Sequence, residues 1–212
     1  MYIAIEGVIG VGKTTLARLL QPSFEAELLL EIFEENPFLP KFYEDRQRYA
    51  FQTQIFFLLS RYHQQHRAVP ELLTKSGNLI SDYTFKKDAL FASTNLHGDE
   101  LEMYHRVHDA LAEKIPTPDL VVYLKASTDV LMHRITLRDR PYERNMAWTY
   151  IEELNQAYDH FFRQPPPDSA TLTIDTNNLD FVRYVDHLEH IEIRIRQALK
   201  LPPFQAELPF VS

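Results

Sequence analysis

Hydrophobic residues gather in five short runs along the chain, separated by longer segments with helical periodicity. Each run is rich in Val, Ile and Leu or alternates with a period of two, which predicts a β-strand. The five predicted strands are Tyr2–Glu6, Leu28–Glu31, Asn78–Asp82, Leu120–Lys125 and Thr171–Asp175. The connections are too long for hairpins, and parallel strands need crossovers of this kind. The pattern therefore predicts an α/β fold, with a central five-stranded parallel sheet flanked by helices.

The intervening segments predict long helices. One runs over Lys41–Ala68, and a second, capped by Ser127 or Thr128, continues from Asp129 to Arg144. A third covers Asp99–Lys114, whose apolar stripe fits the core or a dimer face, with core packing the default. The segment Pro165–Pro167 predicts a stiff linker before the last strand.

Acidic residues stand at the carboxyl ends of four predicted strands, namely Glu6, Glu31, Asp82 and Asp175. Ligands of open α/β sheets bind at this edge of the sheet. We therefore expect the chemistry of the protein to be found there.

A glycine-rich segment after the first strand fits the P-loop pattern: Gly7-Val8-Ile9-Gly10-Val11-Gly12-Lys13-Thr14. It precedes the predicted helix Thr15–Leu20, which is the context that the pattern requires. Inward-facing backbone N–H groups would hold phosphate oxygens, the lysine would neutralise β/γ-phosphate charge, and the threonine hydroxyl would face Mg²⁺. The residues expected to hold the nucleotide are Gly7, Gly10, Gly12, Lys13, Thr14 and Thr15.

Composition limits the class of protein. The chain has 212 residues, 45% hydrophobic and 25% charged, which suits one folded domain over residues 1–212. It has no Cys, so thiolate nucleophiles and Cys-ligated metals are excluded. A net charge of −8 argues against nucleic acid as a partner and favours a small ligand. Without a charged leader or a membrane-length apolar run, we expect a cytoplasmic protein with no membrane anchor.

Positive charge is concentrated in one segment of this acidic chain. Arg134, Arg138, Arg140 and Arg144 fall within eleven positions, and the first two share a helical face. Arginines clamp a phosphoryl group during transfer. The alternative at this point is a solvated helix with surface ion pairs.

The helix predicted over residues 41–68 carries Gln47, Gln54 and Arg61 at seven-residue spacing, so the three share a stripe. Gln54 lies between Phe51 and Leu58 on its own face, where a buried amide needs hydrogen-bond partners. A glutamine amide can read a nucleobase edge, although a solvated glutamine on the helix edge is the alternative.

Taken together, the motifs resemble the deoxynucleoside kinase family, and within it the bacterial deoxyguanosine/deoxyadenosine kinase branch. The resemblance covers Tyr2 to Gln197. It rests on the P-loop and on four further segments. These are Glu31 to Asp45, which contains Asn36-Pro37-Phe38-Leu39; Phe51 to Tyr62; Ser81-Asp82-Tyr83 with Phe91-Ala92-Ser93; and His133 to Pro141.

The resemblance implies a P-loop kinase fold with an arginine-rich lid at about residues 138–146, a homodimer, and ATP with Mg²⁺ as cofactors. It implies that Glu31 is the general base for a 5′-hydroxyl and that Tyr43 and Glu143 hold the 3′-hydroxyl. Gln54 would bond the base with Arg61 near it. The lid cations around the donor phosphates would be Arg134, Arg138 and Arg140, the first two catalytic with Lys13. Asp175 and the loop 176–178 would hold the donor adenine.

The chain departs from the wider family after the third strand. It has Ser81-Asp82-Tyr83 where many members carry an acidic residue, Arg and Ser. Lys87 lies where a base-reading Asp is expected, which makes it a candidate substrate ligand. Asp82 is still expected to serve Mg²⁺ through the phosphates, with Thr14. Lys86 and Lys87 are the candidates for the missing cation near Glu31.

The sequence thus predicts an ATP-dependent kinase of a purine deoxynucleoside in nucleotide salvage, with deoxyguanosine favoured and deoxyadenosine possible. The alternatives are a nucleoside monophosphate kinase, a kinase preferring deoxycytidine or thymidine, and a nucleotide-binding protein without catalysis. The carboxylates Glu31, Glu34 and Glu35 on the acceptor side suit a neutral nucleoside better than a phosphate.

Overall fold

The computed structural model describes residues 1–164 and 167–203, in which five parallel strands form one sheet. The strand order is β2-β3-β1-β4-β5. The strands are β1 Tyr2–Glu6, β2 Glu27–Leu29, β3 Leu79–Ser81, β4 Leu120–Lys125 and β5 Ala170–Asp175. Each pairing is parallel, so the predicted α/β fold with a five-stranded parallel sheet is confirmed.

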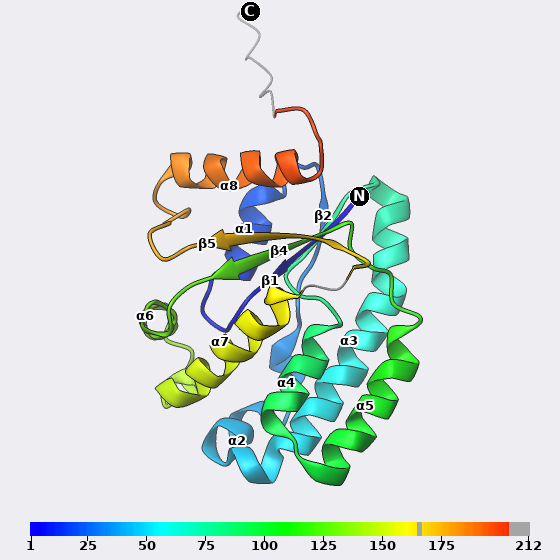
Figure 1. The fold of residues 1–212 in the computed structure, drawn as a ribbon, viewed down its shortest axis with the longest axis vertical. Coiled ribbons are helices and arrows are strands. Elements are labelled where there is room, and N and C mark those ends of the chain that lie inside the picture. The colour runs from blue at the N-terminus through cyan, green and yellow to red at the C-terminus, as the bar shows by residue number, and fades with distance from the viewer. Residues whose placement is uncertain (165–166, 204–212) are drawn as a thin grey trace, which may run out of the picture.

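Helices cover both faces of this sheet. The helices are α1 Lys13–Leu20, α2 Leu39–Glu44, α3 Arg46–Ser76, α4 Lys87–Asn95, α5 Gly98–Ala112, α6 Thr128–Arg138, α7 Trp148–Arg163 and α8 Val185–Ala198. Two 3₁₀ turns, η1 Phe33–Glu35 and η2 Pro141–Glu143, lie near the carboxyl edge of the sheet. Figure 1 shows α1 and α8 above the sheet and α3, α4, α5 and α7 below it.

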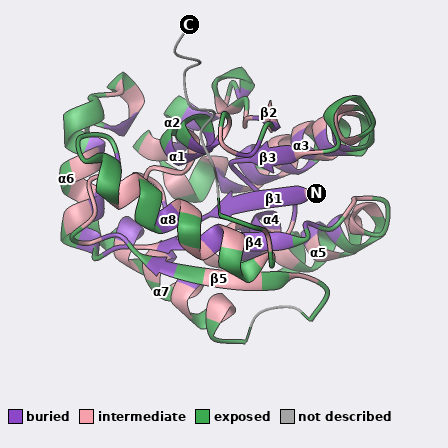
Figure 2. Ribbon diagram, turned by 90° about the horizontal axis from the view of Figure 1, so that it is seen from above, coloured by how far each residue is buried: buried purple, intermediate pink, exposed green. Residues whose placement is uncertain are grey.

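The central strands are buried because both of their faces are covered. Every residue of β1 is buried, with Ile3 opposite Ile80 of β3 and Ile5 opposite Val122 of β4. Figure 2 shows the same buried band running through β1, β3 and β4. Near-continuous apolar strands are typical of such parallel sheets. This rigid layer fixes the position of the loops at its carboxyl edge.

The helix predicted over residues 41–68 is two helices, and the second is longer than predicted. Asp45 ends α2 and caps α3, its side chain accepting a hydrogen bond from the backbone N–H of Arg48. The helix then continues through Pro70 to Ser76. A proline inside a helix costs one hydrogen bond, but buried Val69 and its neighbours pack against Tyr2, Leu79 and the rest of a second apolar cluster. Burial therefore outweighs the cost.

The helix predicted to run to Arg144 ends at Arg138, so that prediction was wrong. Asp139 adopts a left-handed conformation, with φ 47° and ψ 47°, and its backbone N–H donates to Ile135 and Thr136 carbonyls. Aspartate tolerates this conformation better than most residues. The chain turns here, and the remaining residues to Arg144 form η2 and the loop around it.

Smaller predictions have mixed outcomes. The helix over residues 99–114 is α5, and its apolar stripe packs against the core as expected. Glu31 lies two residues beyond the end of β2, and Asp82 one residue beyond β3. Of the proline linker, residues 165 and 166 lie outside the described part of the chain.

Among the described residues, no helix is long and apolar enough to cross a membrane.

Candidate active site

The P-loop joins β1 to α1 at the carboxyl edge of the sheet, and its glycines are required by close backbone packing. Gly7 has a φ of 147°, and a Cβ there would lie 2.5 Å from the Leu124 carbonyl oxygen of β4. Gly10 has a φ of 88°, and a Cβ there would lie 2.7 Å from Ile135 of α6. Only glycine fits both positions without strain. The loop backbone is therefore held against β4 on one side and α6 on the other.

Lys13 and Thr14 begin α1, in the place predicted for phosphate binding. The Lys13 ammonium donates to the carbonyl oxygens of Gly7 (2.7 Å) and Val8 (3.2 Å). Burial, with a smaller contribution from the charge of Lys87, lowers the pKa of Lys13 to about 8. The site therefore holds a positive charge that an anionic ligand would stabilise.

Asp82 connects the P-loop to the second strand. Its Oδ2 accepts a hydrogen bond from the Thr14 hydroxyl (2.5 Å), and its Oδ1 accepts one from the backbone N–H of Glu31 (2.8 Å). A hydroxyl and a carboxylate side by side are hard oxygen ligands that suit Mg²⁺, which usually keeps waters and phosphate oxygens as its other ligands. The described residues contain no group of three or more acidic or histidine side chains placed to hold a metal alone.

Two cations hold the Glu31 carboxylate from opposite sides. Lys87 Nζ lies 2.5 Å from Oε2, while Arg61 donates to Oε1 from Nε (2.9 Å) and from Nη2. Burial by itself would raise the pKa of Glu31, but the charges and hydrogen bonds of Arg61 and Lys87 outweigh it and hold that pKa far below its ordinary value. Glu31 is therefore ionised and fixed in one orientation. Of the two candidate lysines, Lys86 instead pairs with Asp168 near the surface.

Asp88 is a site residue that the sequence analysis missed. It is fully buried in the first turn of α4, and its carboxylate accepts a hydrogen bond from Arg61 Nη1. The resulting chain of charges runs Asp88, Arg61, Glu31, Lys87. An acidic residue in the first turn of a helix is ordinarily explained by the helix dipole. This pattern by itself therefore gives no indication that Asp88 pairs with Arg61. The available signal is the pair Lys87-Asp88, in which Lys87 lines the cavity and Asp88 pairs with Arg61 behind it.

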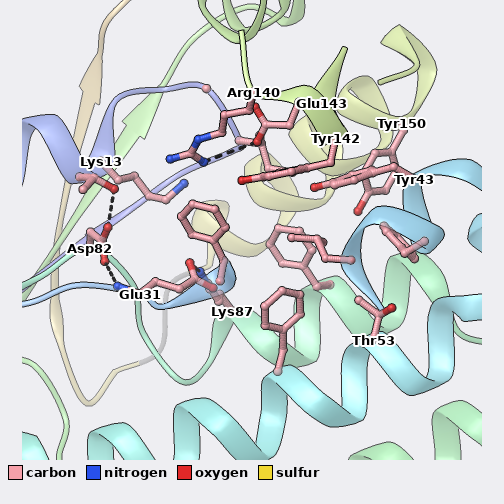
Figure 3. Close-up of a pocket in the computed structure, with 18 of the residues that line it drawn as sticks. Lys13, Glu31, Tyr43, Thr53, Asp82, Lys87, Arg140, Tyr142, Glu143 and Tyr150 are labelled. Carbon is pink, nitrogen blue, oxygen red and sulfur yellow. Dashed lines mark hydrogen bonds and ion pairs between the residues drawn. The ribbon is translucent and has the colours of Figure 1, made fainter. Parts of the chain in front are cut away.

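A cavity extends from the P-loop past Glu31 toward α3, and aromatic side chains line much of it. Tyr43 and Tyr142 stack with 6.2 Å between ring centroids, and Phe57 lies under the Arg61 guanidinium. In Figure 3, Lys13, Asp82 and Glu31 lie on one side of this cavity and Tyr43 and Tyr150 on the other. Its length and aromatic walls suit a flat organic ligand with one end at Glu31.

Gln54 faces this cavity from α3. The residue is only 2% exposed, yet its amide makes no hydrogen bond to any described residue. Arg61 lies two turns further along the same helix and uses three of its N–H groups on Glu31 and Asp88. Since a guanidinium has five N–H groups, two remain. The Gln54 amide therefore presents both a donor and an acceptor to the cavity, where a ligand can pair with them.

The lid residues Arg138 and Arg140 both pair with Glu143. Arg138 makes a bidentate contact to the buried Glu143 carboxylate at 2.7 and 2.6 Å, and Arg140 lies 3.6 Å from it. The Arg140 guanidinium also lies over the Phe33 ring, 4.2 Å from its centroid. Figure 3 shows Arg140 and Glu143 at the rim of the cavity. Arg138, Arg140, Glu143 and Tyr43 thus all line the same cavity, and their roles toward a substrate stay predictions.

The Arg134 side chain contacts the protein beside the P-loop, and its predicted role at the donor phosphates stays a prediction. Its guanidinium donates to the Thr176 carbonyl (2.7 Å) and hydroxyl (3.1 Å), the Leu179 carbonyl (3.3 Å) and the Val11 carbonyl (3.3 Å). It thus ties the P-loop to the loop after β5. Asp175 is also used locally, because its Oδ1 accepts from the backbone and side chain of Asn177. A second cavity beside this loop includes Thr15, Asn177, Asn178 and Phe181.

Replacing Arg134 with Lys is expected to raise the KM for ATP about tenfold and to leave kcat within about threefold. A lysine cannot reproduce the fork of four contacts, and each lost hydrogen bond contributes about 1 kcal/mol. Initial rates at varied ATP measure both constants. Arg144→Lys, in an exposed pair with Asp139, is the control. A large fall in kcat at unchanged KM would instead place Arg134 on the transferred phosphate.

Comparison with known proteins agrees with this geometry. The sequence profile of the deoxynucleoside kinase family matches residues 3–200. Deoxyguanosine kinase of Bacillus subtilis is 36% identical over 93% of this chain and 97% of its own length. Deoxyadenosine/deoxycytidine kinase of the same organism is 30% identical over 75% of each chain. The structure of deoxyadenosine kinase from M. mycoides with bound dATP superposes with a TM-score of 0.80 and 28% identity, over 92% of this chain and 99% of that one.

The chain belongs to the deoxynucleoside kinase family. It has the P-loop kinase fold of these relatives and is an enzyme that transfers a phosphoryl group to an alcohol acceptor. Deoxyguanosine kinases and deoxyadenosine kinases are among its relatives, and one relative also takes its name from a pyrimidine nucleoside.

Proposed function

We propose that this enzyme transfers the γ-phosphoryl group of ATP to the 5′-hydroxyl of a purine deoxynucleoside, with deoxyguanosine preferred over deoxyadenosine. The observation that carries the proposal is the pairing of Gln54 and Arg61 on the wall of the cavity, where the Gln54 amide makes no hydrogen bond to a described residue and Arg61 keeps two N–H groups that no described residue uses. Guanine offers two acceptors, N7 and O6, on one edge, whereas adenine offers one acceptor and one donor. Arginine donors favour the guanine edge.

Glu31 supports a neutral acceptor. Its carboxylate lies at the P-loop end of the cavity and would accept the proton of the 5′-hydroxyl. A carboxylate with a strongly lowered pKa is a weak base, but phosphoryl transfer passes through a loose transition state in which little base strength is needed. The same carboxylate would also hold the hydroxyl in line with the donor.

The charges around the acceptor end argue against a nucleoside monophosphate. Arg61 is paired with two carboxylates and Lys87 with one. A substrate that already carried a phosphate would bring it beside the Glu31 carboxylate, whose two neighbouring cations are already paired. A nucleoside, which has no charge, meets no such penalty.

The remaining residues fit the ends of the two substrates. Tyr43 and Glu143 lie on one wall of the cavity, where a phenol and a carboxylate can hold a 3′-hydroxyl. Thr14 and Asp82 would hold Mg²⁺ through the donor phosphates, and the ion would neutralise charge on them. Lys13 would bind the same phosphates, and the lid arginines would close over them.

The test is ADP release with ATP and Mg²⁺ across deoxyguanosine, deoxyadenosine, deoxycytidine and thymidine, with dGMP and dAMP as monophosphate controls. We expect kcat/KM to be highest for deoxyguanosine, then deoxyadenosine, and at least about tenfold lower for the pyrimidines, which corresponds to about 1.4 kcal/mol. A pyrimidine at the head of the ranking would overturn the purine preference. Turnover of the monophosphates alone would overturn the acceptor class.

A further inference from the structure

Lys87 occupies a position that helix stability alone disfavours. It is the first residue of α4 and follows another lysine, so two cations stand at the positive end of the helix dipole. Lys87 is also only 6% exposed. Burying an ammonium costs several kcal/mol unless the charge is paired. The contacts of the Lys87 ammonium must therefore account for a lysine at this position.

The ammonium faces Glu31 and the cavity. Its Nζ lies 2.5 Å from Glu31 Oε2 and, with Lys13 and Asp82, lines the P-loop end of the cavity. Glu31 is not held by Lys87 alone, because Arg61 donates two N–H groups to the other oxygen. The Glu31 carboxylate therefore keeps Arg61 as a partner, and a defined orientation, when the Lys87 ammonium moves to another ligand.

Lys87 also lies close to where the donor phosphates are expected. Glu31 is joined to the P-loop by its backbone N–H on Asp82, which in turn accepts from Thr14. Lys13 and Lys87 both line the cavity at this end. Two ammonium groups that repel each other across one cavity are stabilised by an anion between them. The group that must pass between the P-loop and Glu31 is the transferred phosphoryl group.

We propose that Lys87 is a catalytic cation whose ammonium contacts the phosphoryl group in transit between the P-loop and the acceptor hydroxyl at Glu31. This inference rests on the proposed function. In the step, the 5′-oxygen forms a bond to the γ-phosphorus while the bond from that phosphorus to the β–γ bridging oxygen breaks. ADP leaves with the electrons of that bond, and the hydroxyl proton passes to Glu31. Lys87 keeps its protons throughout and stabilises the charge on the non-bridging oxygens.

The first test compares Lys87→Met with Lys87→Arg and with Lys86→Met as the matched control. Lys87→Met should lower kcat by about 10²- to 10³-fold, as the loss of one transition-state donor does elsewhere, with the KM for the nucleoside within about threefold. Lys87→Arg keeps the charge and should retain activity within about tenfold of wild type. Lys86→Met removes an outward-facing lysine from the same turn and should match wild type. A near-wild-type kcat for Lys87→Met would overturn the proposal.

A second test separates contact with phosphate from mere positioning of Glu31. Single-turnover rates are measured for Glu31→Gln and for the double variant Glu31→Gln/Lys87→Met. If Lys87 contacts the phosphoryl group, the double variant should be at least about tenfold slower than Glu31→Gln alone. If Lys87 acts only through Glu31, the two rates should be equal, and the proposal fails.

Folding and the proposed function are checked separately. Nucleoside affinity by calorimetry without ATP should be unchanged in Lys87→Met, and its melting temperature should lie within a few degrees of wild type. If that variant does not fold, Lys87→Gln takes its place in both tests. Wild-type enzyme inactive with every nucleoside would overturn the proposed function itself, whereas active wild type with an equally active Lys87→Met would overturn only this inference.

Discussion

Replacing Glu31 with Gln is expected to lower kcat by about 10²-fold or more, with the KM for the nucleoside changed by less than about threefold. General base catalysis contributes about 10²- to 10⁴-fold, and the amide has nearly the same shape as the carboxylate but cannot take the hydroxyl proton. Steady-state rates with deoxyguanosine and ATP measure the effect.

The control for this substitution is Glu35→Gln, an exposed carboxylate on the same segment. The glutamine at position 31 can present its oxygen to Arg61 or to Lys87 but not to both, so its melting temperature has to be measured beside its rate. A folded Glu31→Gln enzyme with a near-wild-type kcat would remove Glu31 from the base role.

Replacing Lys13 with Met is expected to lower kcat/KM for ATP by about 10³-fold while nucleoside affinity stays unchanged. The ammonium is the P-loop charge nearest the expected β- and γ-phosphates, and within residues 1–164 and 167–203 its hydrogen-bond partners are the carbonyl oxygens of Gly7 and Val8. Its contribution grows as phosphate charge develops, so both binding and rate should suffer. Lys75→Met, an exposed lysine paired with Glu27, is the control.

The pH dependence gives a second measurement of the same residue. The pKa of Lys13 is lowered to about 8, so the ammonium is charged below that pH and neutral above it. In wild type, the affinity of the free enzyme for ATP should therefore weaken as pH rises through about 8. The same titration in Lys13→Met should be flat over this range. An equal pH dependence in both would assign it to another group.

The elements that local chemistry dictates could be predicted from the sequence. The P-loop is coded within eight residues, and β1 and β4 have the predicted bounds because buried parallel strands read as continuous apolar runs. Helix ends were harder to predict. Asp139 ends α6 by adopting a left-handed conformation that aspartate takes only occasionally, and α3 passes Pro70 because tertiary packing compensates for the lost hydrogen bond.

Site residues could be predicted where the residue type itself indicates the chemistry. They could not be predicted where the role of a residue depends on which side chains it contacts. Glu31, Gln54 and Glu143, each named from the sequence, all line one cavity. Whether Lys86 or Lys87 reaches Glu31, and whether Arg134 contacts loop carbonyls, depends on residues 42 to 123 positions away in the chain. Asp88 was missed for the same reason, since its partner Arg61 comes from another helix.

The position of β1 at the centre of the sheet divides the enzyme into two parts that can be exchanged separately. The acceptor groups come from β2, α3 and α4 on one side of β1, and the donor loop follows β5 on the other. A chimera that takes residues 31–91 from a relative with another base preference would thus carry a new acceptor pocket beside an unchanged nucleotide site. Glu143, Tyr142, Tyr150 and Tyr158 are exceptions, because they line the acceptor cavity from the donor half. Laboratory evolution of substrate range should accordingly accumulate its changes in α3 and at the lid.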